Sequence, residues 1–208
     1  MARNLILVLA LASAASSLAA APLNVRIVDA SGRPVRDAVV TLYPAGSAAR
    51  AAHAGGRFVI AQHNLQFQPF ITIIPVGADV SFPNLDPTKH HVYSFSPAKK
   101  FELKLFAKDQ SRTVHFEKAG VVALGCNIHD QMSAFIVVTA SAWTARTNGQ
   151  GMVTFADAPN TPGRLMVWQP YLRAPGGELQ QSVSPGQRNA TFQIRLRPPP
   201  AAMPMADY

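Results

Sequence analysis

The chain has 208 residues, of which 48% are hydrophobic and only 14% are charged, and this composition supports a packed core and excludes wholesale disorder. The formal net charge is +8, but the basic residues are scattered and form no run interleaved with aromatic residues, which excludes a nucleic-acid-binding groove. Seventeen prolines and thirteen glycines favour strands and turns over helices.

The first 21 residues have the three regions of a secretory signal peptide. Arg3 supplies a positive charge, residues 5–15 form an apolar run, and small residues follow from Ser16 to Ala21. The apolar run is shorter than the roughly twenty residues that a membrane span requires. We therefore expect residues 1–21 to direct export to the periplasm and to be removed, which leaves a mature chain without a membrane span.

Short apolar or alternating segments follow, separated by turn residues, and each segment predicts a strand. They are residues 23–28, 38–42, 58–60, 70–74, 80–82, 91–95, 114–116, 120–125, 134–138, 152–155, 165–168 and 190–196. Asn148-Gly149 also predicts a hairpin that leads into residues 152–155. Many short strands with closely spaced turns are typical of β-sandwiches, so the sequence predicts an all-β chain.

The single cysteine, Cys126, carries the main chemical signal. A lone cysteine in an exported chain forms no internal disulfide, and an exposed free thiol would be open to oxidation. Cys126 is therefore either buried and inert or occupied. Its neighbours favour occupation, because Cys126, His129 and Met132 form the pattern C-x2-H-x2-M in a loop between two predicted strands.

The donor types in this pattern favour copper. A short loop can direct a thiolate, an imidazole and a thioether at one point, and the segment with His90 and His91 can supply a second imidazole. Two imidazoles and a thiolate in a plane, with a weak axial thioether, are the ligands of blue-copper electron-transfer sites. The sequence thus predicts one copper ion and single-electron transfer.

Other interpretations explain fewer of these residues. Structural zinc commonly takes two or more cysteines, and methionine is a poor zinc ligand. A nucleophilic Cys126 with His129 as its base would leave Met132 unexplained, and no hydrolase signature surrounds it. A buried structural cysteine with incidental histidines is a further alternative. We do not expect an enzyme, because the sequence lacks the His-x-His sets of a trinuclear copper centre and the second cysteine of a binuclear one.

The loop from Gly125 to Met132 resembles that of the cupredoxins of the amicyanin and plastocyanin type. Residues 84–92 are similar to the segment that carries the first histidine ligand in this family, with His90 in the ligand place and His91 in the place of an asparagine. The resemblance implies the ligand set His90, Cys126, His129 and Met132. It also implies that the His91 ring ties the two ligand loops together. The loop lacks the amicyanin proline before the second histidine, which leaves the reduction potential open.

A wider resemblance covers most of the mature chain. Residues 82–84, 90–96, 101–103 and 125–130 are similar to bacterial plastocyanin-like proteins labelled methylamine utilisation proteins. This resemblance implies electron exchange with a redox protein such as a c-type cytochrome or a dehydrogenase, past the exposed edge of His129. The alternatives are a copper-delivery protein that carries no electrons and a metal-free interaction module.

The flanking segments resemble a different family. Residues 32–40 and 144–168 are similar to the two halves of a prealbumin-like, carboxypeptidase-regulatory module. We therefore expect a Greek-key cupredoxin β-sandwich at residues 57–139, inserted into a second, small β-sandwich formed by residues 22–56 and 140–197. Residues 198–208 are expected to be a disordered tail, and the protein to be a monomer. The alternative is that residues 23–45 form the cupredoxin's own first strands.

Overall fold

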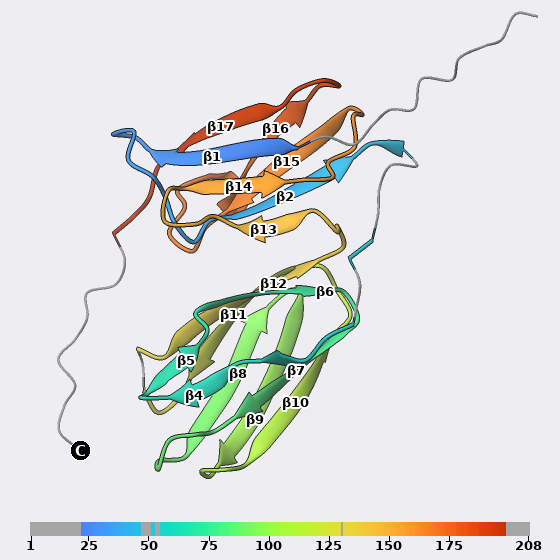
Figure 1. Ribbon diagram of the computed structural model, residues 1–208. Helices are drawn as coiled ribbons and strands as arrows, with labels where there is room; N and C mark the ends of the chain where they lie inside the picture. Colours follow the sequence, from blue (N-terminus) through green and yellow to red (C-terminus); the bar gives the residue numbers. More distant parts are fainter. Residues whose placement is uncertain (1–21, 47–50, 53–54, 130, 199–208) are drawn as a thin grey trace, which may run out of the picture.

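The computed structural model describes residues 22–46, 51–52, 55–129 and 131–198, in which the regular secondary structure is β-strand apart from short 3₁₀ segments (Figure 1). The predicted signal peptide and residues 199–208 of the predicted tail lie outside the described residues. Within the described ranges, no helix has the length and apolar character needed to cross a membrane. The predicted all-β fold class is confirmed.

The strands separate into two groups that each form a sandwich. The first group, which we call the flanking sandwich, contains β1 (Leu23–Asp29), β2 (Val39–Pro44), β13 (Thr144–Arg146), β14 (Met152–Phe155), β15 (Gly163–Trp168), β16 (Glu178–Val183) and β17 (Asn189–Ile194), with the short 3₁₀ helix η2 (Pro175–Gly177). The second group, the central sandwich, contains β3 (Phe58–Val59), β4 (Ala61–His63), β5 (Gln66–Gln68), β6 (Ile71–Pro75), β7 (Ala78–Pro83), β8 (His90–Ser96), β9 (Lys99–Phe106), β10 (Ser111–Phe116), β11 (Gly120–Cys126) and β12 (Ser133–Thr139).

The flanking sandwich packs the sheet β14-β1-β17 against the sheet β13-β2-β15-β16. Successive side chains of a strand point to opposite faces, and β1 shows the result. Leu23, Val25 and Ile27 are buried in the core, whereas Asn24 and Arg26 between them are partly or fully exposed. Strands from both ends of the described chain thus share one hydrophobic core.

The central sandwich packs the sheet β10-β7-β3 against the sheet β6-β12-β11-β8-β9. β11 runs antiparallel to both β12 and β8, and Cys126 is paired with Val92 of β8. The core is formed by large apolar side chains such as Phe82, Phe106 and Phe116, and it extends to Cys126 and Met132 at one end. This end of the core is where the predicted ligands lie.

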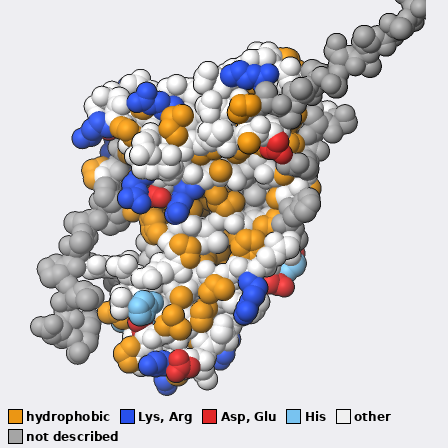
Figure 2. Space-filling view, in the orientation of Figure 1, with side chains coloured by type: hydrophobic (Ala, Val, Ile, Leu, Met, Phe, Trp, Pro, Cys, Tyr) orange, Lys and Arg blue, Asp and Glu red, His pale blue; other side chains and the backbone are white. Residues whose placement is uncertain are grey.

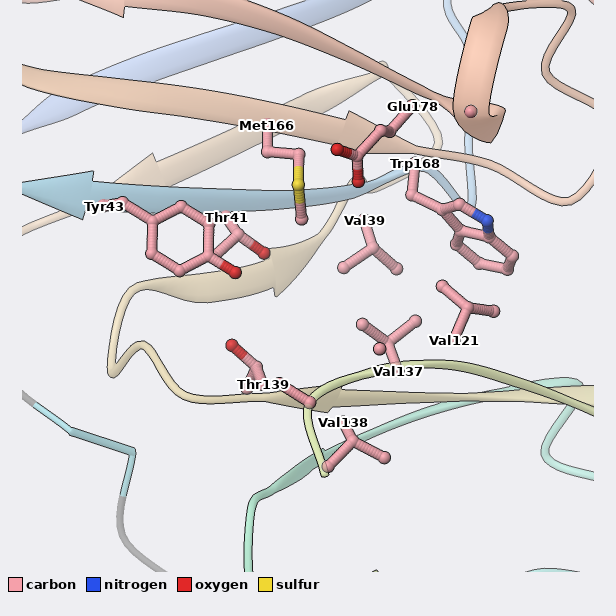
Figure 3. Close-up of a pocket in the computed structure, with 13 residues that line it drawn as sticks. Val39, Thr41, Tyr43, Val121, Val137, Val138, Thr139, Met166, Trp168 and Glu178 are labelled. Carbon is pink, nitrogen blue, oxygen red and sulfur yellow. The ribbon is translucent and has the colours of Figure 1, made fainter. Parts of the chain in front are cut away.

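An apolar cluster joins the two sandwiches. Val39 of the flanking sandwich packs with Ile71 and Val137 of the central one, and the rings of Phe135 and Trp168 lie 5.3 Å apart between their centroids. Beside this cluster the facing sheets line a partly open cavity of about 350 Å³, into which side chains of both sandwiches project (Figure 3). On the face shown in Figure 2, the basic side chains are scattered over both sandwiches, as the sequence indicates.

Two details differ from the expected strands. The predicted hairpin at Asn148-Gly149 is wrong. A turn is present, in which the Asn148 carboxamide oxygen accepts hydrogen bonds from the backbone amides of Gln150 and Met152. The strands on either side of it do not pair with each other, because β13 pairs with β2 and β14 pairs with β1. The strands β4, β5, β9, β13 and β16 were also not expected. β4, β5 and β13 have three residues each, and most residues of β16 are polar, so these four lack the alternation that identifies a half-buried strand. β9 does alternate apolar and charged side chains over residues 101–105, and this signal was overlooked.

Candidate metal centre

Strand alternation brings the first two predicted ligands onto one face. In β11, the side chains of Val122, Leu124 and Cys126 are buried, and the residues between them are more exposed. In β8, His90 and Val92 point inward in the same way. Because Cys126 is the cross-strand partner of Val92, the inward-facing His90 lies beside the cysteine at the end of the core.

The other two predicted ligands come from the loop between β11 and β12. Met132, the last residue before β12, donates its backbone N–H to the carbonyl of His129 at 2.9 Å, which closes a tight turn. Met132 is buried in the same core cluster as Cys126, and His129 is partly exposed. The loop therefore presents one ligand candidate to the core and another toward the surface.

Three donor atoms converge. The Cys126 sulfur lies 3.7 Å from His90 Nδ1 and 4.0 Å from His129 Nδ1, and all three atoms lie within 4.8 Å of one another. Imidazole and thiolate bonds of about 2.0–2.3 Å, arranged in a plane at 120°, place donor atoms roughly 3.5–4.0 Å apart. The two sulfur–nitrogen distances match this spacing. The His–Cys–His group is compatible with copper binding, and the ligand role of Met132 stays a prediction.

The sequence analysis did not identify Asp86, whose carboxylate contacts the Nε2 edge of the His90 ring, opposite the edge that faces Cys126. Its Oδ2 lies 2.8 Å from His90 Nε2, and both side chains are buried. The same carboxylate accepts the backbone N–H groups of Asn64, at 2.7 Å, and Leu65, at 3.0 Å. A carboxylate with three donors around it accepts a proton-bearing Nε2, which leaves Nδ1 as the ring nitrogen that faces Cys126. The spacing Asp86-x3-His90 was the available signal.

Asn84 shapes the loop that carries Asp86. Its side chain is fully buried, and its amide nitrogen donates to the carbonyls of Thr88, at 2.8 Å, and Phe106, at 3.0 Å. Its amide oxygen accepts the backbone N–H of Asp86 at 2.9 Å. Asparagine favours such local bonds to the main chain, and here they set the path of the chain from β7 into β8.

The site favours a thiolate. Burial raises the pKa of the Cys126 thiol, but hydrogen bonds from the His90 ring and from the backbone of His91, Ile128 and His129 outweigh it and lower the pKa to about 6. Burial lowers the pKa of His90, yet the neighbouring Cys126 and Asp86 raise it above its usual value. The thiolate is the form that binds metals, so the protein environment prepares Cys126 for coordination.

The expected role of the His91 ring is wrong. Alternation along β8 turns this ring away from Cys126, and its Nε2 lies 3.0 Å from the Glu102 carboxylate with the ring against Tyr93. The two ligand loops are joined through the main chain instead, because the Asn127 N–H donates to the His91 carbonyl at 3.3 Å. Of the two adjacent histidines, His90 is the one that joins the donor group.

Comparisons with known proteins find copper proteins among the solved structures, whereas no family model and no curated protein matches the chain. A Cu-containing nitrite reductase from Thermus scotoductus SA-01 is similar at 22% identity and a TM-score of 0.39, over 46% of this chain and 25% of that enzyme. A reduced Cu(I) form of an amicyanin mutant is similar at 22% identity and a TM-score of 0.37, over 48% of this chain and 98% of amicyanin. A purple cupredoxin from Nitrosopumilus maritimus follows at 21% identity and a TM-score of 0.36, over 39% and 99%.

These neighbours include the cupredoxins that the sequence resembles. The chain spans about a quarter of the nitrite reductase, and the TM-scores lie below 0.5, so no activity, substrate or partner is carried over from these proteins. Function is therefore inferred from the donor atoms of this chain.

Proposed function

We propose that the protein is a periplasmic, mononuclear type 1 copper protein that carries single electrons. The observation that supports it is the convergence of His90 Nδ1, Cys126 Sγ and His129 Nδ1 at the end of a packed β-sandwich. Copper is favoured over zinc because the group has only one cysteine and is followed by the buried Met132, whose thioether would suit copper as a weak ligand and is a poor ligand for zinc. Copper bound there supplies the Cu(II)/Cu(I) couple.

The chain's own residues perform three tasks in this function. Cys126 provides the thiolate on a rigid strand, and His90 is held in one orientation by its buried surroundings. A close-packed scaffold resists movement, which keeps the donor positions similar in both oxidation states. His129 is the more exposed of the two imidazoles, and the neighbouring Ile128 is 45% exposed, so this end of the sandwich is the route by which electrons enter and leave.

The visible spectrum of the copper-loaded protein tests the metal assignment. We expect an intense blue thiolate-to-copper band in the wild type and none in Cys126→Ser, because a serine hydroxyl cannot replace the thiolate. His115→Ala is the matched control, since His115 is an exposed histidine of the same sandwich that contacts Asp79 instead of the donor group, and it should stay blue. A colourless wild type or a blue Cys126→Ser protein contradicts the proposal.

Electron transfer is tested separately from copper binding. We expect the oxidised protein, as a monomer, to take an electron rapidly from a reduced redox protein such as a c-type cytochrome, measured by stopped-flow absorbance. Fast loss of copper to a chelator, with no electron exchange, would instead identify a copper-delivery protein. Recovery of the protein from the periplasmic fraction, with its N-terminus near residue 22, tests the predicted export.

A further inference from the structure

Asp86 is unusual in the central sandwich because it is a buried carboxylate whose contacts are all hydrogen-bond donors. Its relative exposure is 4%, and its two oxygens receive the Asn64 and Leu65 amides and the His90 ring. Burial of a charge is costly, so a carboxylate in such a position is expected to have a specific role. Two roles are possible: it anchors the turn between β4 and β5, or it acts on His90.

The contact with His90 acts on a ring that belongs to the donor group, which a carboxylate that only anchored the turn would not do. An imidazole that donates its Nε2–H to a carboxylate becomes a stronger donor through Nδ1, and the nearby negative charge adds to this effect. Both effects stabilise the more highly charged Cu(II) state more than Cu(I). They also keep the ring from rotating, because the ring is held on one side by Asp86 and faces Cys126 on the other.

We propose that Asp86 is a positioning residue for the copper site, which orients the imidazole of His90 and lowers the reduction potential by favouring Cu(II). This inference rests on the proposed copper function and deepens it. The carboxylate does not bind the metal; it acts through the ring that does.

Asp86→Asn is the direct test because it keeps the size of the side chain and removes the charge. We expect the Cu(II) affinity to fall by about 10–100-fold, with a smaller loss for Cu(I). If the affinity for Cu(II) falls tenfold more than the affinity for Cu(I), the reduction potential rises by about 59 mV. Both affinities are measured by chelator competition and the potential by redox titration, on the full-length exported protein.

Asp79→Asn is the matched control. Asp79 forms another carboxylate–histidine contact of the central sandwich, with its Oδ1 2.8 Å from His115 Nδ1, but both side chains are exposed and lie outside the donor group. The same change of charge there should leave the potential at the wild-type value. Asp86→Glu, which keeps the charge, should shift the potential less than Asp86→Asn does.

A second measurement needs only the wild type, in case Asp86→Asn fails to fold. In the diamagnetic Cu(I) protein, the Nε2–H of His90 should exchange with solvent slowly and resonate far downfield, whereas that of His129 should exchange fast. Equal exchange of the two protons, or a blue Asp86→Asn protein with an unchanged potential, overturns the role of Asp86 and leaves the copper function intact. A wild type that binds no copper overturns both.

Discussion

The two sandwiches of this protein share an architecture but differ in what they bury. In the described part of the flanking sandwich, the buried polar side chains are neutral, and those of Ser141 and Thr147 bond to nearby main chain. The central sandwich buries Asp86, His90 and Cys126 next to one another. Buried titratable groups cost free energy, and they persist where they have a chemical task.

The two cores therefore have different expected roles, the central one in function and the flanking one in stability. The flanking core is closed by apolar side chains from both ends of the described chain, and it packs against the central sandwich through the cluster around Trp168. The ligand candidates all lie in the central sandwich and none of them lies in that cluster. We therefore expect changes in the flanking core to alter stability alone.

The largest expected effect on stability comes from the flanking core. Ile27→Ala removes a fully buried side chain and should lower the free energy of unfolding by about 2–5 kcal/mol. The blue band and the reduction potential of the folded protein should not change. Denaturant unfolding followed by circular dichroism measures the first quantity, and the visible spectrum at low temperature checks the second. A bleached but folded Ile27→Ala protein would show that the site depends on the flanking sandwich.

A smaller effect, divided between stability and metal binding, is expected at Asn84. Asn84→Ala removes the side chain that bonds to the Thr88 and Phe106 carbonyls and to the Asp86 amide. Thr88 is only partly buried, so water can replace part of the loss, and we expect a total cost of about 1–3 kcal/mol. Copper affinity should also fall because the loop that carries Asp86 loses its support. Chelator competition and denaturant unfolding measure the two effects.

Thr147→Ala is the counterpart of that change in the flanking sandwich. The Thr147 hydroxyl donates to the Val35 carbonyl at 2.9 Å and accepts the Ala38 amide at 3.0 Å, so its loss leaves buried main-chain groups unpaired in the same way. We expect a similar loss of stability and an unchanged copper affinity. Equal losses of copper affinity in both variants would remove the distinction between the sandwiches.

The candidate ligands could be predicted because their signal is local. Cys126, His129 and Met132 fall within seven residues, and the period-2 pattern of two strands then places His90 beside the cysteine. The role of Asp86 was not predicted, because it depends on the Asn64–Leu65 turn, whose backbone donors reach the carboxylate only in the folded chain. Contacts of this kind tune the reduction potential of a copper site together with the ligands themselves.

The success of strand prediction also depended on how local the signal was. Residues 23–28 alternate strongly and were predicted, since one face is buried and the other is not. β9 was missed although residues 101–105 alternate apolar and charged side chains, which is the pattern of a half-buried strand, so its signal was present in the sequence and overlooked. β16 was missed because most of its residues are polar, which leaves no such alternation. Asn148-Gly149 was correctly identified as a turn, but a turn signal does not determine whether the two strands that it joins pair with each other.

The smallest effect expected is a titration in the metal-free protein, and it again separates the two sandwiches. The Cys126 thiol has a pKa of about 6 in the folded chain, against about 8.5 in an unfolded one, so folding favours the thiolate. The stabilisation from this group is complete above the unfolded pKa and is lost as the pH falls through about 6. The ultraviolet absorbance of the thiolate should rise with a midpoint near that pH in the folded wild type, and near 8.5 in denaturant.

Ile27→Ala should show the same folded midpoint, whereas Asp86→Asn should shift it, since the His90 ring that stabilises the thiolate is itself held by Asp86. A folded midpoint equal to the denatured one would mean that the hydrogen bonds to the sulfur do not outweigh its burial.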